Sequence, residues 1–198
     1  LAAARDLVTR TYGYNSERAQ QIMSDEFFLN SRGNRPYKWQ LDIAEALLLG
    51  LNCTAIAGTG RGKTIPFMLP MFLPKNMKKM VAVMSPLKNL QRDQARQFRK
   101  MNLPAVAVNG DTWDSAMASI FTSPKMYMKH AECNNVLTER GLSKGISALI
   151  VDEAHCISQW GGDFRPSYSK MSQVRAHLPQ GTPVGCFSAM MAPDALEE

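Results

Sequence analysis

The sequence is poor in the features that mark disulfide-rich, zinc-binding and membrane proteins. Its 198 residues include only four cysteines and three histidines, and no two cysteines stand at a CxxC or zinc-ligand spacing. In a chain of this length we expect reduced thiols, an intracellular protein and no structural zinc. No uninterrupted apolar run reaches the ~18 residues that a membrane span requires, because Pro66, Pro70 and Pro74 interrupt the most apolar stretch. We therefore expect no membrane partner.

The sequence also lacks internal repeats, low-complexity tracts, a recognisable linker and a signal peptide. Hydrophobic residues make up 45% of the chain and charged residues 20%, which excludes an intrinsically disordered protein. The length fits one compact domain with a short appendage. The chain starts with Leu1 rather than Met, so we expect a fragment or a processed product. The net charge of +6 permits a polyanionic partner but does not demand one.

What is present is an alternation of apolar, strand-like runs with helical stretches. The strand-like runs occupy residues 53–56, 80–84, 105–108, 119–122, 148–151 and 184–187. Helices are predicted for residues 39–49, 62–72, 88–99, 124–129 and 168–177, with weaker periodicity before residue 34. Continuous apolar strands separated by helices predict an α/β domain whose mainly parallel sheet carries helices on both faces. Ligands of such sheets bind where strands end and helices begin.

The first strand end is followed by a glycine-rich loop of a kind that binds phosphate. The loop consists of Ala57, Gly58, Thr59, Gly60, Arg61, Gly62, Lys63 and Thr64. Its backbone N–H groups can converge on phosphate oxygens, and we expect all three glycines to supply permissive dihedral angles. Lys63 is expected to reach the β- and γ-phosphates, and the Thr64 hydroxyl to coordinate Mg²⁺. The alternative is an ordinary glycine-rich turn that leaves Lys63 on the surface.

A later strand end carries an acidic segment, Asp152-Glu153-Ala154-His155. Adjacent carboxylates at the end of a buried strand are costly without a cation or hydrogen bonds, and Mg²⁺ prefers oxygen ligands. We expect Asp152 to hold the metal, Glu153 to polarise an attacking water and His155 to link this site to the other end of the domain. The alternative is a polar strand end at which Asp152 caps the next helix. Together with the phosphate loop, the segment predicts nucleotide hydrolysis.

Residues 152–168 resemble the RecQ family of superfamily 2 DNA helicases, in which an acidic box precedes an aromatic-rich loop; the loop residues here are Gln159, Trp160, Phe164 and Arg165. The resemblance implies that Trp160, Phe164 and Arg165 contact single-stranded DNA. It also implies that Gln159 helps to couple this contact to ATP hydrolysis. Aromatic faces stack on bases and arginine binds phosphate regardless of sequence, which agrees with that role. From the residues alone, Trp160 and Phe164 could instead anchor a loop in the core.

Other segments match the same family in the same order along the chain. The matching residues are Gln40 in an adenine-reading segment, Ser85 and Pro86 in a DNA-contacting motif, Thr122 at a strand end that meets the DNA backbone, and Ser188 in a motif that ties the ATP state to DNA grip. Two positions depart from the family pattern. Met190 replaces the usual threonine of the Ser188 motif, and Gly162 replaces a common histidine. These departures put efficient coupling and unwinding in question, but not ATP binding.

The resemblance covers residues 35–198 and implies the first of two RecA-like domains, with 1–34 as an N-terminal helical appendage and the second RecA-like domain absent. It implies the ATP-binding motor domain of a 3′–5′ DNA helicase. ATP and Mg²⁺ would be its cofactors, single-stranded or duplex DNA its partner, and the nucleus its location. We expect the chain alone to bind ATP but to hydrolyse it weakly, because the arginine finger of a second domain would be missing.

Two rival interpretations stay open. One is a degenerate helicase remnant that binds nucleic acid or a partner without efficient turnover. The other is a helicase-like ATPase that acts on RNA or remodels protein–nucleic-acid complexes.

Overall fold

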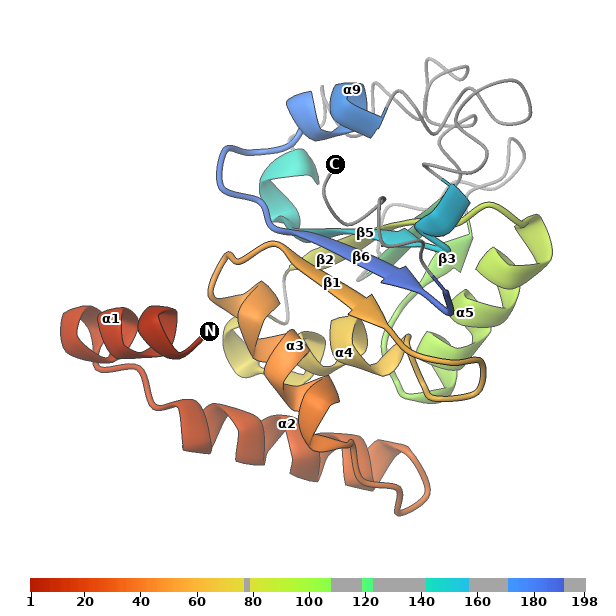
Figure 1. The fold of residues 1–198 in the computed structure, drawn as a ribbon. Coiled ribbons are helices and arrows are strands. Elements are labelled where there is room, and N and C mark those ends of the chain that lie inside the picture. The colour runs from red at the N-terminus through yellow and green to blue at the C-terminus, as the bar shows by residue number, and fades with distance from the viewer. Residues whose placement is uncertain (77–78, 108–118, 123–141, 157–170, 191–198) are drawn as a thin grey trace.

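The computed structural model describes residues 1–76, 79–107, 119–122, 142–156 and 171–190. Six strands in this part of the chain form one sheet, in the order β1-β6-β5-β2-β4-β3, and all pairs are parallel (Figure 1). The strands are β1 (Cys53–Ile56), β2 (Met80–Met84), β3 (Val106–Ala107), β4 (Ser119–Thr122), β5 (Ile146–Asp152) and β6 (Val184–Ser188). The predicted α/β fold with a parallel sheet is confirmed, and each predicted strand run falls on one of these strands.

Helices precede, connect and follow the strands. Within the described residues they are α1 (Ala2–Tyr12), α2 (Ser16–Asn30), α3 (Lys38–Leu48), α4 (Ile65–Met68), α5 (Lys88–Lys100) and α9 (Met171–Ala176), with short 3₁₀ helices at Leu69–Phe72, Pro74–Asn76 and Leu142–Gly145. The helix predicted at 124–129 lies outside the described residues, and the one predicted at 168–177 is described only in its second part, as α9. None of the described helices is long and apolar enough to cross a membrane.

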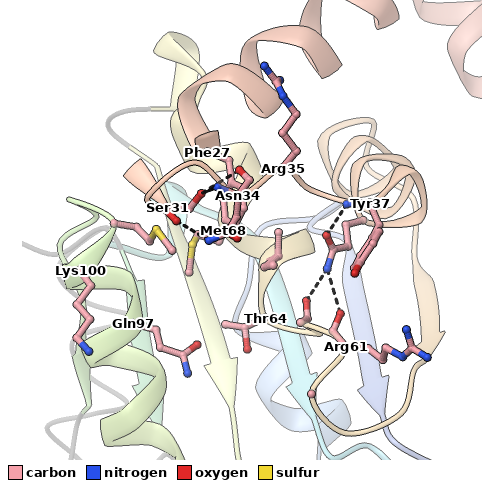
Figure 2. Close-up of a pocket in the computed structure, with 15 residues that line it drawn as sticks. Phe27, Ser31, Asn34, Arg35, Tyr37, Arg61, Thr64, Met68, Gln97 and Lys100 are labelled. Carbon is pink, nitrogen blue, oxygen red and sulfur yellow. Dashed lines mark hydrogen bonds between the residues drawn. The ribbon is translucent and has the colours of Figure 1, made fainter. Parts of the chain in front are cut away.

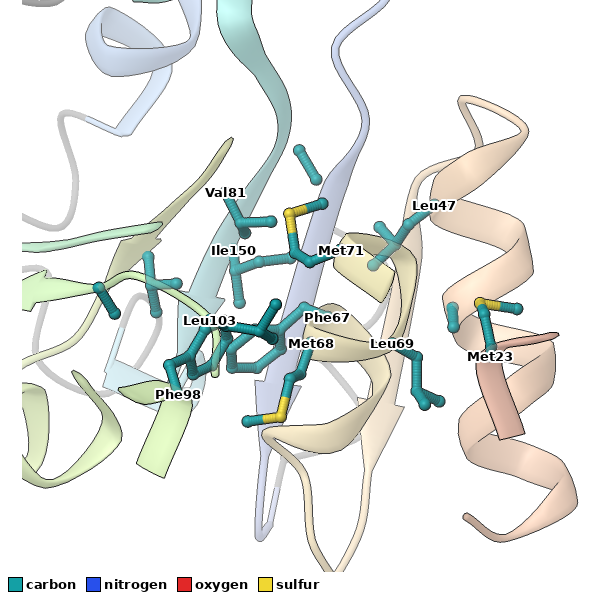
Figure 3. Close-up of a cluster of buried hydrophobic side chains, with 14 of the residues drawn as sticks. Met23, Leu47, Phe67, Met68, Leu69, Met71, Val81, Phe98, Leu103 and Ile150 are labelled. Carbon is teal, nitrogen blue, oxygen red and sulfur yellow. The ribbon is translucent and has the colours of Figure 1, made fainter. Parts of the chain in front are cut away.

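One face of the sheet is covered by α3, α4 and α5, and α2 packs on α3 and on the 3₁₀ helix at Leu69–Phe72; these helices and the sheet enclose the larger hydrophobic core (Figure 3). Phe67 of α4 connects these layers. Its ring packs edge-on against Phe187 of β6, with 5.3 Å between centroids, and stacks on Phe98 of α5 at 6.0 Å. Aromatic pairs at such distances contribute about 0.5–1.5 kcal/mol beyond their buried area. The core therefore fixes α4, and with it the end of the phosphate loop, against the sheet.

The opposite face of the sheet packs against a smaller core. Along β2, Val81 and Val83 belong to the larger core, whereas Met80, Ala82 and Met84 belong to the smaller one. This division follows from the alternation of side chains along a strand. Val174 of α9 and the following Leu178 complete the smaller core. Because β2 is buried on both faces, its sequence reads as one continuous apolar run.

The helix after the phosphate loop is shorter than the sequence predicts. The pattern predicts one helix over residues 62–72, but α4 spans only Ile65–Met68 and a 3₁₀ helix follows at Leu69–Phe72. Gly62 has φ of +72°, which a right-handed helix cannot include. Pro70 has no N–H to donate to the carbonyl four residues earlier, so the α-helical pattern stops there. The prediction of one continuous helix is therefore wrong.

The two N-terminal helices are held in different ways. α2 contributes Met23 and Phe27 to the larger core, whereas no residue of α1 is buried. Instead, the Arg5 guanidinium of α1 donates hydrogen bonds of 2.7 Å to Asp42 and 2.9 Å to Glu45, both in α3. The Glu45 side chain is 0% exposed. A partly buried cluster of ion pairs, rather than apolar packing in the core, therefore attaches α1 to the domain.

Candidate nucleotide-binding site

The phosphate loop joins β1 to α4 at the carboxyl edge of the sheet. Gly60 and Gly62 have φ of +80° and +72°, in the left-handed region that glycine adopts without strain. Gly58 is not among the described residues with positive φ, so the prediction that all three glycines need such a conformation is wrong for Gly58. A Cβ at Gly62 would lie 2.8 Å from Ile65 Cδ1 and 2.9 Å from Gln40 Nε2. Both backbone conformation and space therefore favour glycine at position 62.

Gln40, in the first turn of α3, holds this loop in place. Its Nε2 donates to the carbonyl oxygens of Arg61 and Gly62, both at 3.1 Å, and its Oε1 accepts from the Tyr37 N–H at 2.8 Å. The residue is buried. Both N–H bonds of the side-chain amide are thus directed at the loop backbone. The predicted reading of adenine by Gln40 stays a prediction, and the observed contact is with the loop itself.

A cavity of about 430 Å³ opens beside the loop, between the start of α3 and α5 (Figure 2). Residues that contribute polar groups or a ring to its lining include Tyr37, Gln40, Arg61, Thr64, Gln97 and Lys100. This volume lies within the range of small-molecule sites. Cationic groups beside an exposed aromatic ring suit a ligand that combines an anionic part with a flat heterocycle. The cavity and the phosphate loop together can therefore accept one nucleotide.

The side chain of Lys63 reaches back to the first residue of the phosphate loop. Its Nζ donates to the Ala57 carbonyl oxygen at 3.0 Å, and the side chain is half-buried. The Ala57 N–H donates to the carbonyl oxygen of Ser188 at 3.0 Å, which joins the loop to the end of β6. An ammonium group has three N–H donors, and the contact with Ala57 uses one of them. The contact of Lys63 with phosphates stays a prediction, and the observed position of its side chain is compatible with it.

Asp152 ends β5 and is 4% exposed. Its Oδ2 accepts a hydrogen bond of 2.7 Å from Gln94 Nε2. Burial raises the pKa of the Asp152 carboxyl, while the hydrogen bond from Gln94 lowers it. The neighbouring charge of Glu153 raises this pKa further, and the charge of Lys63 lowers it. A cation placed here would favour the charged carboxylate, since opposite charge offsets the cost of desolvation.

Glu153 and His155 form a second polar group directly after Asp152. Glu153 has φ of +53°, a left-handed conformation that is strained for a residue with a Cβ. His155 Nδ1 lies 3.3 Å from Glu153 Oε2 and 2.9 Å from Ser188 Oγ. The Ser188 hydroxyl donates its proton to the Met190 carbonyl oxygen. Which atom donates in the His155–Ser188 bond depends on the tautomer of the imidazole ring.

The predicted metal ligands, Thr64 and Asp152, follow strands at the same edge of the sheet. Among the described residues, no group of three or more His, Cys, Asp or Glu side chains is arranged to hold a metal ion. One carboxylate and one hydroxyl suit a hard cation that takes its remaining ligands from phosphate oxygens and water. The residues thus fit Mg²⁺ that binds together with a nucleotide.

The sequence profile of the DEAD/DEAH box helicase family matches residues 37–198, which include the phosphate loop and the acidic segment. The chain belongs to this family. Over 167 residues it is 33% identical to the probable ATP-dependent DNA helicase RecS of Bacillus subtilis, covering 81% of this chain and 33% of that protein. It is 28% identical to the RecQ-like DNA helicase BLM of Xenopus laevis over 93% of this chain and 14% of that protein. The predicted resemblance to RecQ helicases is confirmed.

The chain spans a third or less of the length of those two relatives. Solved helicase structures share its fold. Saccharomyces cerevisiae Dbp5 bound to RNA and ADP BeF3 superposes with a TM-score of 0.63 at 19% identity, over 88% of this chain and 46% of that one. The DUF1998 helicase MrfA bound to DNA gives a TM-score of 0.67 at 16% identity, over 89% of this chain and 27% of that one. At such identities the likeness establishes the RecA-like fold alone.

The helicase residues predicted to contact DNA are described only in part. Ser85 follows β2, and Thr122 ends the neighbouring strand β4. The Ser85 N–H donates to the Thr122 carbonyl oxygen at 2.9 Å. Their side chains are buried, and Pro86 is half-buried. Outside the described part lie three more residues predicted to contact DNA, Trp160, Phe164 and Arg165. Gln159, predicted to couple this contact to ATP hydrolysis, and Gly162, which departs from the family pattern, lie outside it too. The predicted roles of these residues stay predictions.

Two residues near the site were not singled out from the sequence. Gln91 and Gln94 lie three positions apart on α5, so they share one face of this helix. Both are buried, and Gln94 bonds directly to Asp152. Buried glutamines are uncommon, but burial cannot be read from residue type alone. The available signal was their i, i+3 spacing on the same side of α5 as the apolar Ala95 and Phe98.

Proposed function

We propose that this chain is the ATP-binding motor domain of a RecQ-like 3′–5′ DNA helicase, which couples ATP hydrolysis to movement along single-stranded DNA and to duplex unwinding. The observation that carries the proposal is the convergence of three groups at one sheet edge: the phosphate loop, the buried Asp152 carboxylate and the His155–Ser188 pair. The RecQ-type relatives support DNA as the substrate, since their names describe DNA helicases.

The proposed roles follow from the positions of the side chains. The loop N–H groups and Lys63 bind the phosphates, with Lys63 moving from the Ala57 carbonyl to the β- and γ-phosphate oxygens. Thr64 and Asp152 hold Mg²⁺, which when bound offsets the negative charge of the phosphates. Glu153 orients the water that attacks the γ-phosphate. Gln40 reads the adenine ring in this proposal, and its hydrogen bonds to the Arg61 and Gly62 carbonyl oxygens support a link between that contact and the loop.

Coupling to DNA is proposed to pass through His155. This residue contacts Glu153 on one side and Ser188 on the other, so it connects the water-orienting carboxylate to the end of β6. By the family resemblance, a second RecA-like domain supplies an arginine that speeds hydrolysis by about 10³–10⁵-fold. We therefore propose that the 198-residue chain alone binds ATP and hydrolyses it slowly. A nuclear location, by analogy with eukaryotic relatives, belongs to the same proposal.

A second candidate function is a helicase remnant that binds nucleotide or nucleic acid without efficient turnover. The specific observation in its favour is Met190, which is 65% exposed and meets Ser188 only through backbone atoms in the bonds observed. A threonine hydroxyl at this position could add a side-chain hydrogen bond, and methionine cannot. A weaker link between the ATP state and DNA grip would follow.

The decisive experiment is calorimetric titration of the folded chain with ATP, with and without Mg²⁺. We expect magnesium-dependent binding at or below millimolar ATP. Replacing Lys63 by Ala should weaken it by about 10–100-fold, because a charge-assisted hydrogen bond to phosphate is lost. Lys79→Ala is the matched control, since Lys79 is an exposed lysine away from the loop. Absence of magnesium-dependent uptake by the wild type would refute the proposal.

Turnover separates the rival functions. The ATPase rate of the full-length protein is measured with no nucleic acid, with single-stranded DNA and with RNA of the same length. A helicase motor predicts stimulation by DNA that Lys63→Ala abolishes. No turnover under any of the three conditions would instead favour the remnant, and stimulation by RNA alone would favour an RNA-directed ATPase.

A further inference from the structure

α5 faces the sheet with two buried glutamines that reach two neighbouring strand ends. Gln91 Nε2 donates to the Ser85 carbonyl oxygen, and Gln94 Nε2 donates to Asp152 Oδ2, both at 2.7 Å. β2 and β5 are paired neighbours, so Ser85 after β2 lies beside Asp152 at the end of β5. Two amide hydrogen bonds therefore attach one helix to the strand end that carries the acidic segment and to the strand end next to it.

This polar layer is not explained by the stability of the fold. Within the described part of the chain, the Oε1 atoms of Gln91 and Gln94 and the hydroxyls of Ser85 and Thr122 are buried without a hydrogen-bond partner. Each such atom loses its bonds to water on folding and gains none in return. Apolar side chains of similar shape would avoid this loss. Because only some polar atoms of this layer have hydrogen-bond partners, we infer that the bonds donated by Nε2 of Gln91 and of Gln94 serve a role other than stability.

We propose that Gln94 is a positioning residue that holds the Asp152 carboxylate in the orientation needed to bind Mg²⁺ with the nucleotide. Gln91 supports it by fixing α5 on the Ser85 carbonyl. The proposal rests on the proposed function and adds a residue to it. Gln94 occupies one acceptor position on Oδ2 and the Glu153 backbone N–H also bonds this carboxylate, so its remaining lone pairs are the ones available to the metal or its water. Such outer hydrogen bonds orient metal ligands in many proteins.

An amide is well suited to this position because it orients a carboxylate without neutralising it. A lysine or arginine at position 94 would form a tighter bond, but its charge would compete with the metal for the same carboxylate. An apolar residue would leave Asp152 free to rotate toward other partners. The Gln94 amide supplies direction and leaves the negative charge of Asp152 for the cation.

The test measures how much Mg²⁺ strengthens nucleotide binding. The dissociation constant of the chain for ATP is determined with Mg²⁺ and with EDTA, and the ratio of the two gives the magnesium-dependent gain. Gln94→Met keeps the shape of the side chain but removes the donor. We expect it to reduce this ratio by about 10-fold and to leave binding in EDTA nearly unchanged. Gln91→Met is expected to reduce the ratio less.

A matched control exists on the other side of the domain. Gln20 Nε2 donates to the buried carboxylate of Glu45 at 2.7 Å, the same kind of bond at the same length. Gln20→Met should cost similar thermal stability without changing the magnesium-dependent gain. Gln94→Asn, whose amide is one methylene shorter, serves as a second variant if Gln94→Met does not fold, and the same loss of the ratio is expected for it.

Two results would overturn the proposal. One is a magnesium-dependent gain in the folded Gln94 variants equal to that of the wild type. The other is an equal loss of affinity with and without Mg²⁺, because that would indicate general damage to the pocket. If the wild type itself shows no gain from Mg²⁺, the proposed function fails first and this inference fails with it. A normal wild type beside unaffected Gln94 variants refutes this inference alone.

Discussion

At the scale of single residues, the phosphate loop is least tolerant of change at Gly62. Its φ is +72°, and a Cβ there would lie 2.9 Å from the Gln40 Nε2 that bonds the loop carbonyls. In Gly62→Ala, the new side chain must adopt a strained conformation and displace that amide. We expect a loss of about 1–3 kcal/mol in the free energy of unfolding. Nucleotide binding should weaken by ~10-fold or more, equivalent to about 1.4 kcal/mol. Urea denaturation and calorimetric titration measure the two effects.

Gly60 provides the control within the same loop. Its φ is +80°, but a Cβ at this position would meet nothing within 4 Å. Gly60→Ala therefore carries the backbone cost alone, about 1–2 kcal/mol. If Gly60→Ala and Gly62→Ala weaken nucleotide binding equally, contact with Gln40 is not what makes position 62 sensitive.

The sequence predicted where the candidate site residues lie but not all of their contacts. The strands before the phosphate loop and the acidic segment are where the sequence places them, so Lys63 and Asp152 lie at one edge of the sheet, and their roles stay predictions. The bond between Gln94 and Asp152 joins residues 58 positions apart and depends on how α5 packs on the sheet. Gln40 was predicted to face a base, whereas the described contacts are with the loop. The direction in which a glutamine side-chain amide points depends on the tertiary structure around it, and a local sequence pattern does not contain this information.

At the scale of secondary-structure elements, α1 depends on one residue for its attachment. Arg5 is the donor to both Asp42 and Glu45, and no residue of α1 is buried. Arg5→Met should lower the free energy of unfolding by about 1–3 kcal/mol, since a buried charged acceptor loses its charged partner. The guanidinium is itself 29% exposed, which keeps the loss below that of a fully buried pair. Chemical denaturation of the variant measures it.

Arg10 on the same helix is the control for this prediction. It pairs with Asp6 at 2.8 Å, and both side chains are largely exposed. An exposed pair four residues apart on a helix contributes about 0.3–0.5 kcal/mol. Arg10→Met should therefore change stability little, and a loss as large as that of Arg5→Met would show that burial of Glu45 is not the cause.

The same contact predicts a dependence of stability on pH. Burial raises the pKa of Glu45, but hydrogen bonds, including those from Arg5 and Gln20, outweigh it and leave the pKa below its usual value. A carboxyl with a lowered folded pKa contributes its stability above the unfolded value of about 4.3 and loses it as pH falls through the folded pKa. In Arg5→Met the lowering by Arg5 is gone and burial remains, so the folded pKa of Glu45 moves up toward or past the unfolded value. The variant should therefore lose less stability than the wild type as pH falls, and denaturation curves of both proteins between about pH 3 and 7 measure this difference.

Elements were predicted best where one physical preference dominates. β1, β2 and β4 have the bounds that their apolar runs predict, because runs bounded by turns leave little choice of register. Residues 62–72 combine apolar residues at helical spacing with Pro70, and the α-helix ends before this proline. Hydrophobic spacing alone overestimates helix length when proline lies within the pattern.

At the scale of the whole molecule, the class of fold followed from the alternation of strands and helices, but the strand order did not. In this sheet β6, the last described strand, lies between β1 and β5, which brings Ser188 beside the phosphate loop and His155. Such an arrangement requires long crossovers that a sequence does not encode locally. The order of the strands is what gathers the three motifs at one edge.

The packing of the whole chain also predicts which part can be removed without harm to nucleotide binding. Phe27 of α2 and Ser31, the residue after this helix, line the cavity, and Met23 of α2 belongs to the larger core. No residue of α1 is part of the cavity lining, and α1 contacts α3 through Arg5. Removal of residues 1–13 should lower stability by about as much as Arg5→Met. The stabilisation by Mg²⁺ and ATP, about 2.7 kcal/mol at a ligand concentration of 100 times the dissociation constant, should remain.

Removal of residues 1–34, the whole stretch before the segment that resembles RecQ, should abolish that stabilisation, because it takes Phe27 and Met23 with it. Thermal melting of the two truncated chains with and without Mg²⁺ and ATP compares them directly. If the longer truncation is stabilised by nucleotide as well as the shorter one, α2 is dispensable and the nucleotide-binding unit begins at the start of α3. If neither is stabilised while the intact chain is, α1 contributes to the pocket through α3, and the contacts of Arg5 with Asp42 and Glu45 are a described route for this effect.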